Sequence, residues 1–207
     1  MGPMTSPGRR WAWYGGRPSL DFVNTRRNRE AGRRDAAVEY LREPADLAAW
    51  LHAAGLVPAG SGGARFPVDE ETLAGALALR EAIDAAVTAT VAAGSVPVKA
   101  VRCVNEWIAA GPERPALRID AGVPVLRAPR SGRTPRGALA LIAADAAELL
   151  GTGLRERLRI CPGAGCGGRF LDDSPAGRRR WCSMAVCGNR SKAAARRQAA
   201  HAAAVRP

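Results

Sequence analysis

Four cysteines near the C-terminus constrain this chain more than any other feature of its sequence. They form two pairs, Cys161 with Cys166 and Cys182 with Cys187, with four residues inside each pair and 15 residues between the pairs. Zinc requires four ligands at the corners of a tetrahedron, and two short cysteine-bearing turns supply them with little loop closure. The spacing therefore predicts one structural Zn²⁺ ion bound by all four thiolates.

Other interpretations of the cysteines stay open at this point. The four could form two disulfides or remain free buried thiols, although a reducing cytoplasm favours metal ligation. A redox role is a further variant, because thiolates beside basic groups are activated nucleophiles, whereas bound zinc normally protects them. The fifth cysteine, Cys103, stands alone on the apolar face of a predicted helix, and we interpret it as a core residue.

Basic charge is concentrated in the same part of the chain. The 207 residues carry a formal net charge of +12, of which residues 151–207 hold +9 and residues 1–150 only +3. Such an excess attracts polyanions, and it favours nucleic acid over an anionic membrane. Charged residues interrupt every apolar segment before it could cross a bilayer, and the first residues lack the apolar middle of a secretory signal. We therefore expect a cytoplasmic, nucleoid-associated protein with no membrane partner.

Helical periodicity dominates the region before the cysteine pairs. Each predicted helix has a capping residue or a first-turn proline near its start, or a regular apolar face. The predicted helices cover about 44–54, 70–93, 98–109 and 135–150. Between the last two, residues 116–127 alternate as two short strands around a turn. We therefore predict a mainly α fold with a small β-hairpin, in the α+β class.

The cysteine segment predicts a treble-clef-like finger. The first ligand pair would lie in a turn where Gly163 and Gly165 permit positive backbone angles. A hairpin of residues 169–171 with 180–181 would follow, and the second pair leads into a helix-forming sequence from Ser191. The expected organisation is a flexible arm at 1–14, a mostly helical domain at 15–150, a zinc finger at 155–200 and a tail at 201–207.

Residues 187–190, Cys-Gly-Asn-Arg, resemble the signature of the CGNR zinc-finger family. The resemblance extends over residues 161–197, and all four ligand positions match. Earlier segments, 16–25 and 46–51 among them, are similar to the ABATE domain usually joined to that finger. The resemblance covers nearly the whole chain. It implies a bacterial, stress-related transcription regulator with a mostly helical N-terminal domain and a C-terminal finger that binds zinc.

Seven basic residues around the second cysteine pair are candidates for nucleic-acid contact. They are Arg178, Arg179, Arg180, Arg190, Lys192, Arg196 and Arg197. On a helix, Lys192 and Arg196 would be neighbours with Arg197 nearby, in a basic stripe that follows a phosphate backbone or enters a groove. The alternative for the stripe is a solvated helix without a partner. Asn189 and Arg190 also have a structural interpretation, in which they cap the helix and brace the finger.

A small polar pocket is predicted in the N-terminal domain. Arg17, Asp21, Asn24 and Thr25 would line it if this segment is helical. A small-molecule effector bound there would change the population of a finger-competent state. The competing interpretation is that Asp21 and Asn24 satisfy local backbone groups or pair with Arg17 or Arg80.

These features favour a DNA-binding transcription regulator whose N-terminal domain senses an effector or mediates assembly, for example as a homodimer. Zinc would organise the fold and do no chemistry, because four cysteines close its coordination shell. The two histidines, His52 and His201, lie in no catalytic spacing, so we expect no enzyme. The alternatives are a zinc-dependent interaction module that binds an acidic partner protein, and a small-molecule enzyme in the N-terminal domain.

Overall fold

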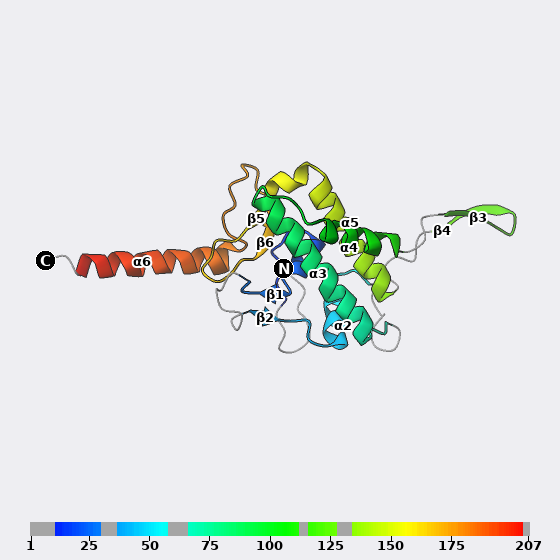
Figure 1. Cartoon of the computed structure of the whole chain (residues 1–207), viewed down its shortest axis with the longest axis horizontal. Coiled ribbons are helices and arrows are strands. Elements are labelled where there is room, and N and C mark those ends of the chain that lie inside the picture. The colour runs from blue at the N-terminus through cyan, green and yellow to red at the C-terminus, as the bar shows by residue number, and fades with distance from the viewer. Residues whose placement is uncertain (1–10, 30–36, 58–65, 112–115, 128–133, 205–207) are drawn as a thin grey trace.

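The computed structural model describes residues 11–29, 37–57, 66–111, 116–127 and 134–204. Figure 1 shows a helical body from which helix α6 projects at one end and the β3–β4 hairpin at the other. The helices are α1 (Pro18–Val23), α2 (Pro44–Ala53), α3 (Glu70–Val91), α4 (Val98–Ala109), α5 (Pro135–Gly151) and α6 (Asn189–Ala204), with short helical turns η3 (Gly153–Arg157) and η4 (Met184–Gly188). The strands are β1 (Arg26–Arg27), β2 (Val38–Glu39), β3 (Ala116–Asp120), β4 (Val123–Arg127), β5 (Leu158–Ile160) and β6 (Arg169–Leu171). The predicted α+β class, with helices dominant, is confirmed.

The helices begin where the capping residues predict. The Asp69 side chain accepts a hydrogen bond of 2.8 Å from the backbone amide of Thr72 at the start of α3. Thr134 accepts one of 3.0 Å from the amide of Gly137 at the start of α5. These bonds satisfy amides that have no partner inside the helix. Local sequence therefore determines where these two helices start.

The core of the body lies between α1, α2, α3 and α5. Its largest fully buried side chains include Trp50 and Phe22, whose ring centroids are 5.2 Å apart. Trp11 is buried as well, and Trp13 stacks on Trp50 with ring centroids 5.7 Å apart. The flexible arm predicted at 1–14 is therefore corrected for residues 11–14, because two tryptophans in this segment pack against the core. Residues 1–10 lie outside the described part of the chain.

The predicted pairing of residues 169–171 with 180–181 is wrong. Strand β6 instead pairs antiparallel with β5, in the register Leu158 with Leu171 and Ile160 with Arg169. The loop of the first cysteine pair joins these two strands directly, so the pairing is local and has a low closure entropy. Backbone groups near 180 are held differently, because the buried Asp172 carboxylate accepts a 3.0 Å hydrogen bond from the Arg179 amide.

The first hairpin of the finger is part of the N-terminal core. Leu158 and Leu171 are buried in the same apolar cluster as Leu20 and Phe22. Strand β6 lies against α1, and β5 lies against α3. The finger and the helical domain therefore share one hydrophobic core rather than being joined by a linker.

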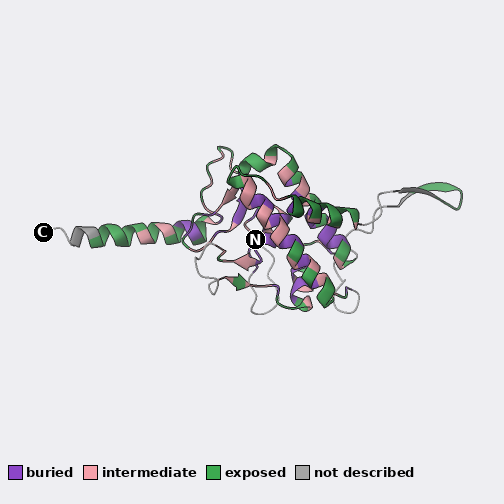
Figure 2. Ribbon diagram, in the orientation of Figure 1, coloured by how far each residue is buried: buried purple, intermediate pink, exposed green. Residues whose placement is uncertain are grey.

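Burial follows this arrangement. Figure 2 shows buried residues throughout the helical body, while α6 and the β3–β4 hairpin are mostly exposed where their side chains are described. The predicted tail at 201–207 is partly helical, since α6 continues to Ala204. Among the described residues, no helix is both long enough and apolar enough to span a membrane.

Candidate metal centre and nucleic-acid interface

The four cysteines of the two pairs converge on one point. Their sulfur atoms all lie within 4.8 Å of one another, and Cys182 Sγ is 3.7 Å from both Cys166 Sγ and Cys187 Sγ. Four sulfurs about 2.3 Å from a tetrahedral zinc ion lie roughly 3.8 Å apart, so the spacing fits zinc. A disulfide needs sulfurs about 2 Å apart, which excludes the two-disulfide alternative in this structure. Cys103 lies outside the cluster. Its interpretation as a core residue is corrected, because it is only half-buried and belongs to neither apolar cluster of the described residues.

Glycines leave room for the sulfurs. Gly165 has a φ of 71°, as predicted, but the same expectation for Gly163 is wrong. Gly163 is required for space instead, because a Cβ added there would lie 3.2 Å from Cys187 Sγ. Gly168 closes the turn by accepting a 2.8 Å hydrogen bond from the Cys161 amide. The first pair is thus held by a tight loop that only small residues can form.

The thiol pKa values differ strongly within the cluster. Hydrogen bonds from Cys166 and Cys182 lower the pKa of Cys161 to about 2, while the hydrogen bond with Cys161 raises the pKa of Cys166 to about 11. The pKa of Cys182 is raised for the same reason. The sulfurs alone therefore favour one thiolate, and four thiolates require a cation between them. The donor set fits Zn²⁺, which would supply that charge.

Arg190 and Asn189 contact the metal centre and the turn before α6. The Arg190 guanidinium lies 3.3 Å from Cys187 Sγ, and this hydrogen bond raises the pKa of Arg190. The Asn189 amide donates a 3.3 Å hydrogen bond to the Ala185 carbonyl. The Arg190 contact braces the finger as expected, but its partner is a ligand sulfur rather than a backbone carbonyl or Asp172. Asn189 does not cap α6, because its side chain bonds back to the preceding turn. Both residues remain exposed to solvent.

Arg179 is surrounded by the finger, in contrast to the other candidate basic residues. Its guanidinium donates to the carbonyls of Tyr14 at 2.9 Å and Cys182 at 2.6 Å. It also lies over the Phe170 ring, 4.8 Å from the centroid. These contacts join the second cysteine pair to the N-terminal segment, so Arg179 is a structural residue in this protein. Sequence reasoning could not separate it from Arg178 and Arg180, which follow the same local pattern.

The other six candidates are exposed. They are Arg178, Arg180, Arg190, Lys192, Arg196 and Arg197. Arg180 lies over the Trp181 ring, 5.5 Å from its centroid. The last four lie on α6, which extends away from the body (Figure 1). These six side chains therefore form a cationic surface around the second cysteine pair and along α6, which we call the basic surface.

The four residues predicted to line an effector pocket make contacts inside the protein. Arg17 lies 2.7 Å from a carboxylate oxygen of Asp145, and Asp21 accepts a 2.8 Å hydrogen bond from the Gly15 amide. Thr25 donates to the Phe22 carbonyl at 2.7 Å. Asn24 makes two hydrogen bonds to the backbone of Arg169. The Asp21 contact matches the competing interpretation, because Gly15 is a local backbone group. Asn24 and Arg17 have partners far along the chain that neither interpretation foresaw.

The Asn24 contacts are the functional feature that sequence reasoning missed. Its side-chain amide donates to the Arg169 carbonyl at 2.8 Å, and its oxygen accepts from the Arg169 amide at 2.9 Å. The Asn24 side chain therefore makes the same paired donor and acceptor hydrogen bonds to β6 that the backbone of a neighbouring strand would make. The Arg169 guanidinium forms a 2.7 Å ion pair with Asp84 of α3. Because these partners are far apart in the chain, no local pattern indicates them.

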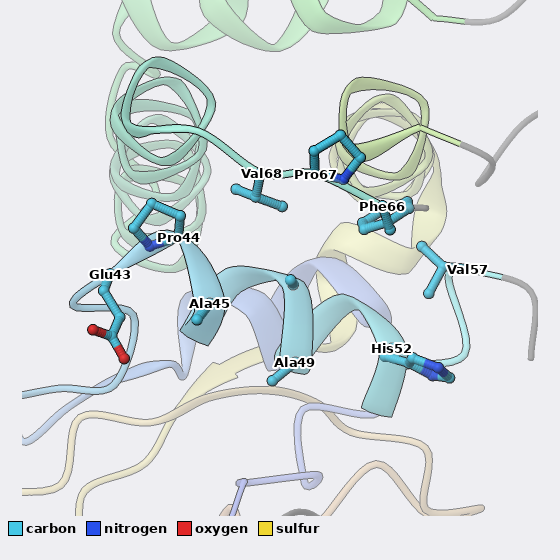
Figure 3. Close-up of a pocket in the computed structure, with 10 residues that line it drawn as sticks. Glu43, Pro44, Ala45, Ala49, His52, Val57, Phe66, Pro67 and Val68 are labelled. Atoms are coloured by element: carbon cyan, nitrogen blue, oxygen red, sulfur yellow. The ribbon is translucent and has the colours of Figure 1, made fainter. Parts of the chain in front are cut away.

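An apolar groove lies on another face of the helical domain. It has a volume of about 650 Å³ and runs along α2, with Phe66, Pro67 and Val68 on the opposite side and Glu43 and His52 toward its two ends (Figure 3). None of the four predicted pocket residues lines it. The groove is thus a separate feature from the site predicted at α1.

Two family models match the sequence. The ABATE family, described as "Putative stress-induced transcription regulator", matches residues 16–153. The CGNR zinc finger matches residues 157–200. No curated protein matches the chain. The clustered sulfurs and the second match together identify a site for one structural zinc ion.

Proposed function

Since the chain belongs to the ABATE family and ends in a CGNR zinc finger, we propose that it regulates transcription by binding duplex DNA through the basic surface. One observation carries the proposal. Helix α6 presents Lys192, Arg196 and Arg197 to solvent, and its sequence contains no acidic residue. Unpaired cations of this kind release counterions when they meet phosphates, which drives association.

Zinc has a structural role in this proposal. Helix α6 begins two residues after the ligand Cys187, so the metal fixes the direction in which the basic helix leaves the body. Four cysteine ligands leave no open coordination position for a substrate. We therefore assign no enzymatic activity to the metal centre.

The N-terminal domain would act as the sensing or assembly part of the regulator. Its connection to the finger supports this role, because Asn24 and Gly15 hydrogen-bond directly to strand β6. A small-molecule effector or a second protomer that shifts α1 would change the position of the finger. Such a regulator would act on chromosomal DNA in the cytoplasm.

Replacement of Arg196 and Arg197 by alanine tests the DNA interaction. We expect the double variant to bind duplex DNA about tenfold more weakly, and to lose roughly two units from the slope of log K against log salt, because two phosphate contacts disappear. Fluorescence anisotropy over a range of salt concentrations measures both quantities. The matched control is the double alanine variant of Lys99 and Arg102, two exposed cations on α4, which should bind like the wild type.

Failure to bind duplex DNA is informative only for protein whose zinc content is known. Protein that contains one equivalent of zinc and ignores duplex DNA even at low salt would overturn the proposal. Retention of an acidic partner protein by the same sample would then favour the interaction-module alternative.

A further inference from the structure

Helix α6 carries its cations in two rows rather than in one stripe. At about 100° per residue, Lys192 and Arg196 lie roughly 40° apart, whereas Arg190 and Arg197 lie roughly 20° apart on a different face. The centres of the two rows are separated by about 130° around the helix axis. The expectation that Arg197 joins the stripe of Lys192 and Arg196 is therefore corrected by the helical geometry of residues 189–204.

Burial indicates which side of α6 faces away from the finger. Ser191 and Ala194 are partly buried, so the finger lies on their side of the helix. Ala193 and Ala200 are exposed on the opposite side, in the shorter arc between the two basic rows. From Ala193 onward, the outward face of α6 is thus a strip of small side chains with a basic row along each edge; Asn189 lies at its N-terminal end.

From this arrangement we infer that α6 lies in the major groove of B-form DNA, with the strip of Ala193 and Ala200 against the base edges. The inference rests on the proposed function and deepens it. The major groove is about 12 Å wide and accepts an α-helix, and its two walls are phosphate backbones. The row of Lys192 and Arg196 contacts one backbone, and Arg197 contacts the other.

The dimensions and chemistry of α6 fit this position. Its 16 residues span about 24 Å, which is most of one turn of the duplex. Alanine methyl groups allow a close approach to the groove floor and contact thymine methyl groups. The helix has no Phe, Tyr or Trp on which unpaired bases could stack, and its one imidazole, His201, lies in the last turn, which argues against a single-stranded ligand. A-form RNA is disfavoured too, because its major groove is deep and narrow.

A matched pair of single substitutions tests which face meets DNA. Ala193→Gln adds a bulky, helix-compatible side chain to the outward strip, and we expect a tenfold or greater loss of affinity for duplex DNA. Ala195→Gln makes the same chemical change about 160° away on the helix and should alter affinity less than threefold. Both residues are exposed, so neither change is expected to disturb folding. Circular dichroism and zinc content verify that the two variants are folded alike.

A second comparison uses DNA and RNA duplexes of the same sequence at one salt concentration. We expect at least a tenfold preference for the DNA duplex. Equal affinity for the two duplexes, or equal effects of the two substitutions, would overturn the groove assignment while leaving the proposed function intact. Absence of binding to every duplex would instead remove the proposed function itself.

Discussion

Asp21 is the residue whose environment has the clearest measurable consequence. Its carboxylate accepts the Gly15 amide at 2.8 Å, and a side chain on Gly15 would bring a Cβ within 2.8 Å of the Asp21 amide. Burial raises the pKa of Asp21 from 3.8 to about 7, and the nearby carboxylate of Asp145 contributes to the rise. The folded protein therefore keeps a proton on Asp21 at pH values where the unfolded chain releases it.

This difference predicts a pH-dependent effect of Asp21→Asn. Between about pH 4 and 7 the folded state binds one proton that the unfolded chain has released. The contribution of Asp21 to the free energy of unfolding therefore falls as pH rises through this range, and it is fully lost above pH 7. Asparagine keeps an acceptor oxygen without the charge. We expect its Tm to exceed that of the wild type by on the order of 3 °C at pH 8 and to match it near pH 4.

Differential scanning fluorimetry at several pH values measures this difference. The wild type and the variant share all other titratable groups. The contributions of those groups to Tm therefore cancel when the two proteins are compared at the same pH. A Tm difference that is the same at pH 4 and pH 8 would contradict the assignment of the raised pKa to Asp21.

At the residue scale, the metal ligands could be predicted from the sequence, but the hydrogen-bond and ion-pair partners of Arg169 and Arg179 could not. Cysteine ligands could be predicted because their spacing along the chain encodes the tetrahedron. The roles of Arg179 and Arg169 could not, since their partners Tyr14 and Asp84 are brought near by the tertiary fold alone. A count of basic residues therefore overestimated the surface available to DNA by including Arg179.

At the scale of elements, the helices were predictable and the strand pairing of the finger was not. Caps at Asp69 and Thr134 are local signals, and they place α3 and α5 where the sequence indicates. Strands β5 and β6 have three residues each, too short for an alternating pattern to choose their partner. The buried Asp172 carboxylate accepts hydrogen bonds from the Ser174 and Arg179 amides, and so it holds the chain that leads to residues 180–181, the expected second strand.

Replacement of one ligand should disorganise the second turn of the finger together with the start of α6. We expect Cys182→Ser to lose its zinc, because three thiolates and a neutral hydroxyl bind the ion much more weakly than four thiolates. The matched control is Cys103→Ser, since Cys103 lies outside the cluster. A colorimetric zinc assay on both proteins gives the stoichiometry, and one bound zinc in Cys182→Ser would contradict the ligand set.

At the scale of the whole molecule, the finger and the helical domain share one hydrophobic core. Leu158 and Leu171 lie in the main core, and Asn24 fastens β6 to the helical domain. The sequence suggested a boundary near residue 155, because the domain organisation was inferred from the order of motifs along the chain. The order of motifs contains no information on which side chains share a core.

Zinc removal should therefore destabilise the helical domain as well as the finger. Chelation releases the loop that connects β5 to β6 and so loosens the contacts of Leu158 and Leu171 with α1 and α3. We expect one unfolding transition, shifted down by on the order of 10 °C, in the tryptophan fluorescence, to which the buried Trp11 and Trp50 of the helical domain contribute. Restoration by added zinc is the control. A main tryptophan transition whose midpoint is unaffected by chelator would show that the two parts unfold independently.

The bonds between Asn24 and Arg169 also set the order of events during synthesis. These residues are separated by 145 positions, so the ribosome has made most of the chain before β6 can reach α1. Until then Leu20 and Phe22, which are fully buried in the finished protein, lack part of their cover. Domains usually fold as they emerge, N-terminal part first. Here the helical domain completes its core only when the first zinc-binding loop has left the ribosome, so a nascent chain stalled before that loop should depend on chaperones.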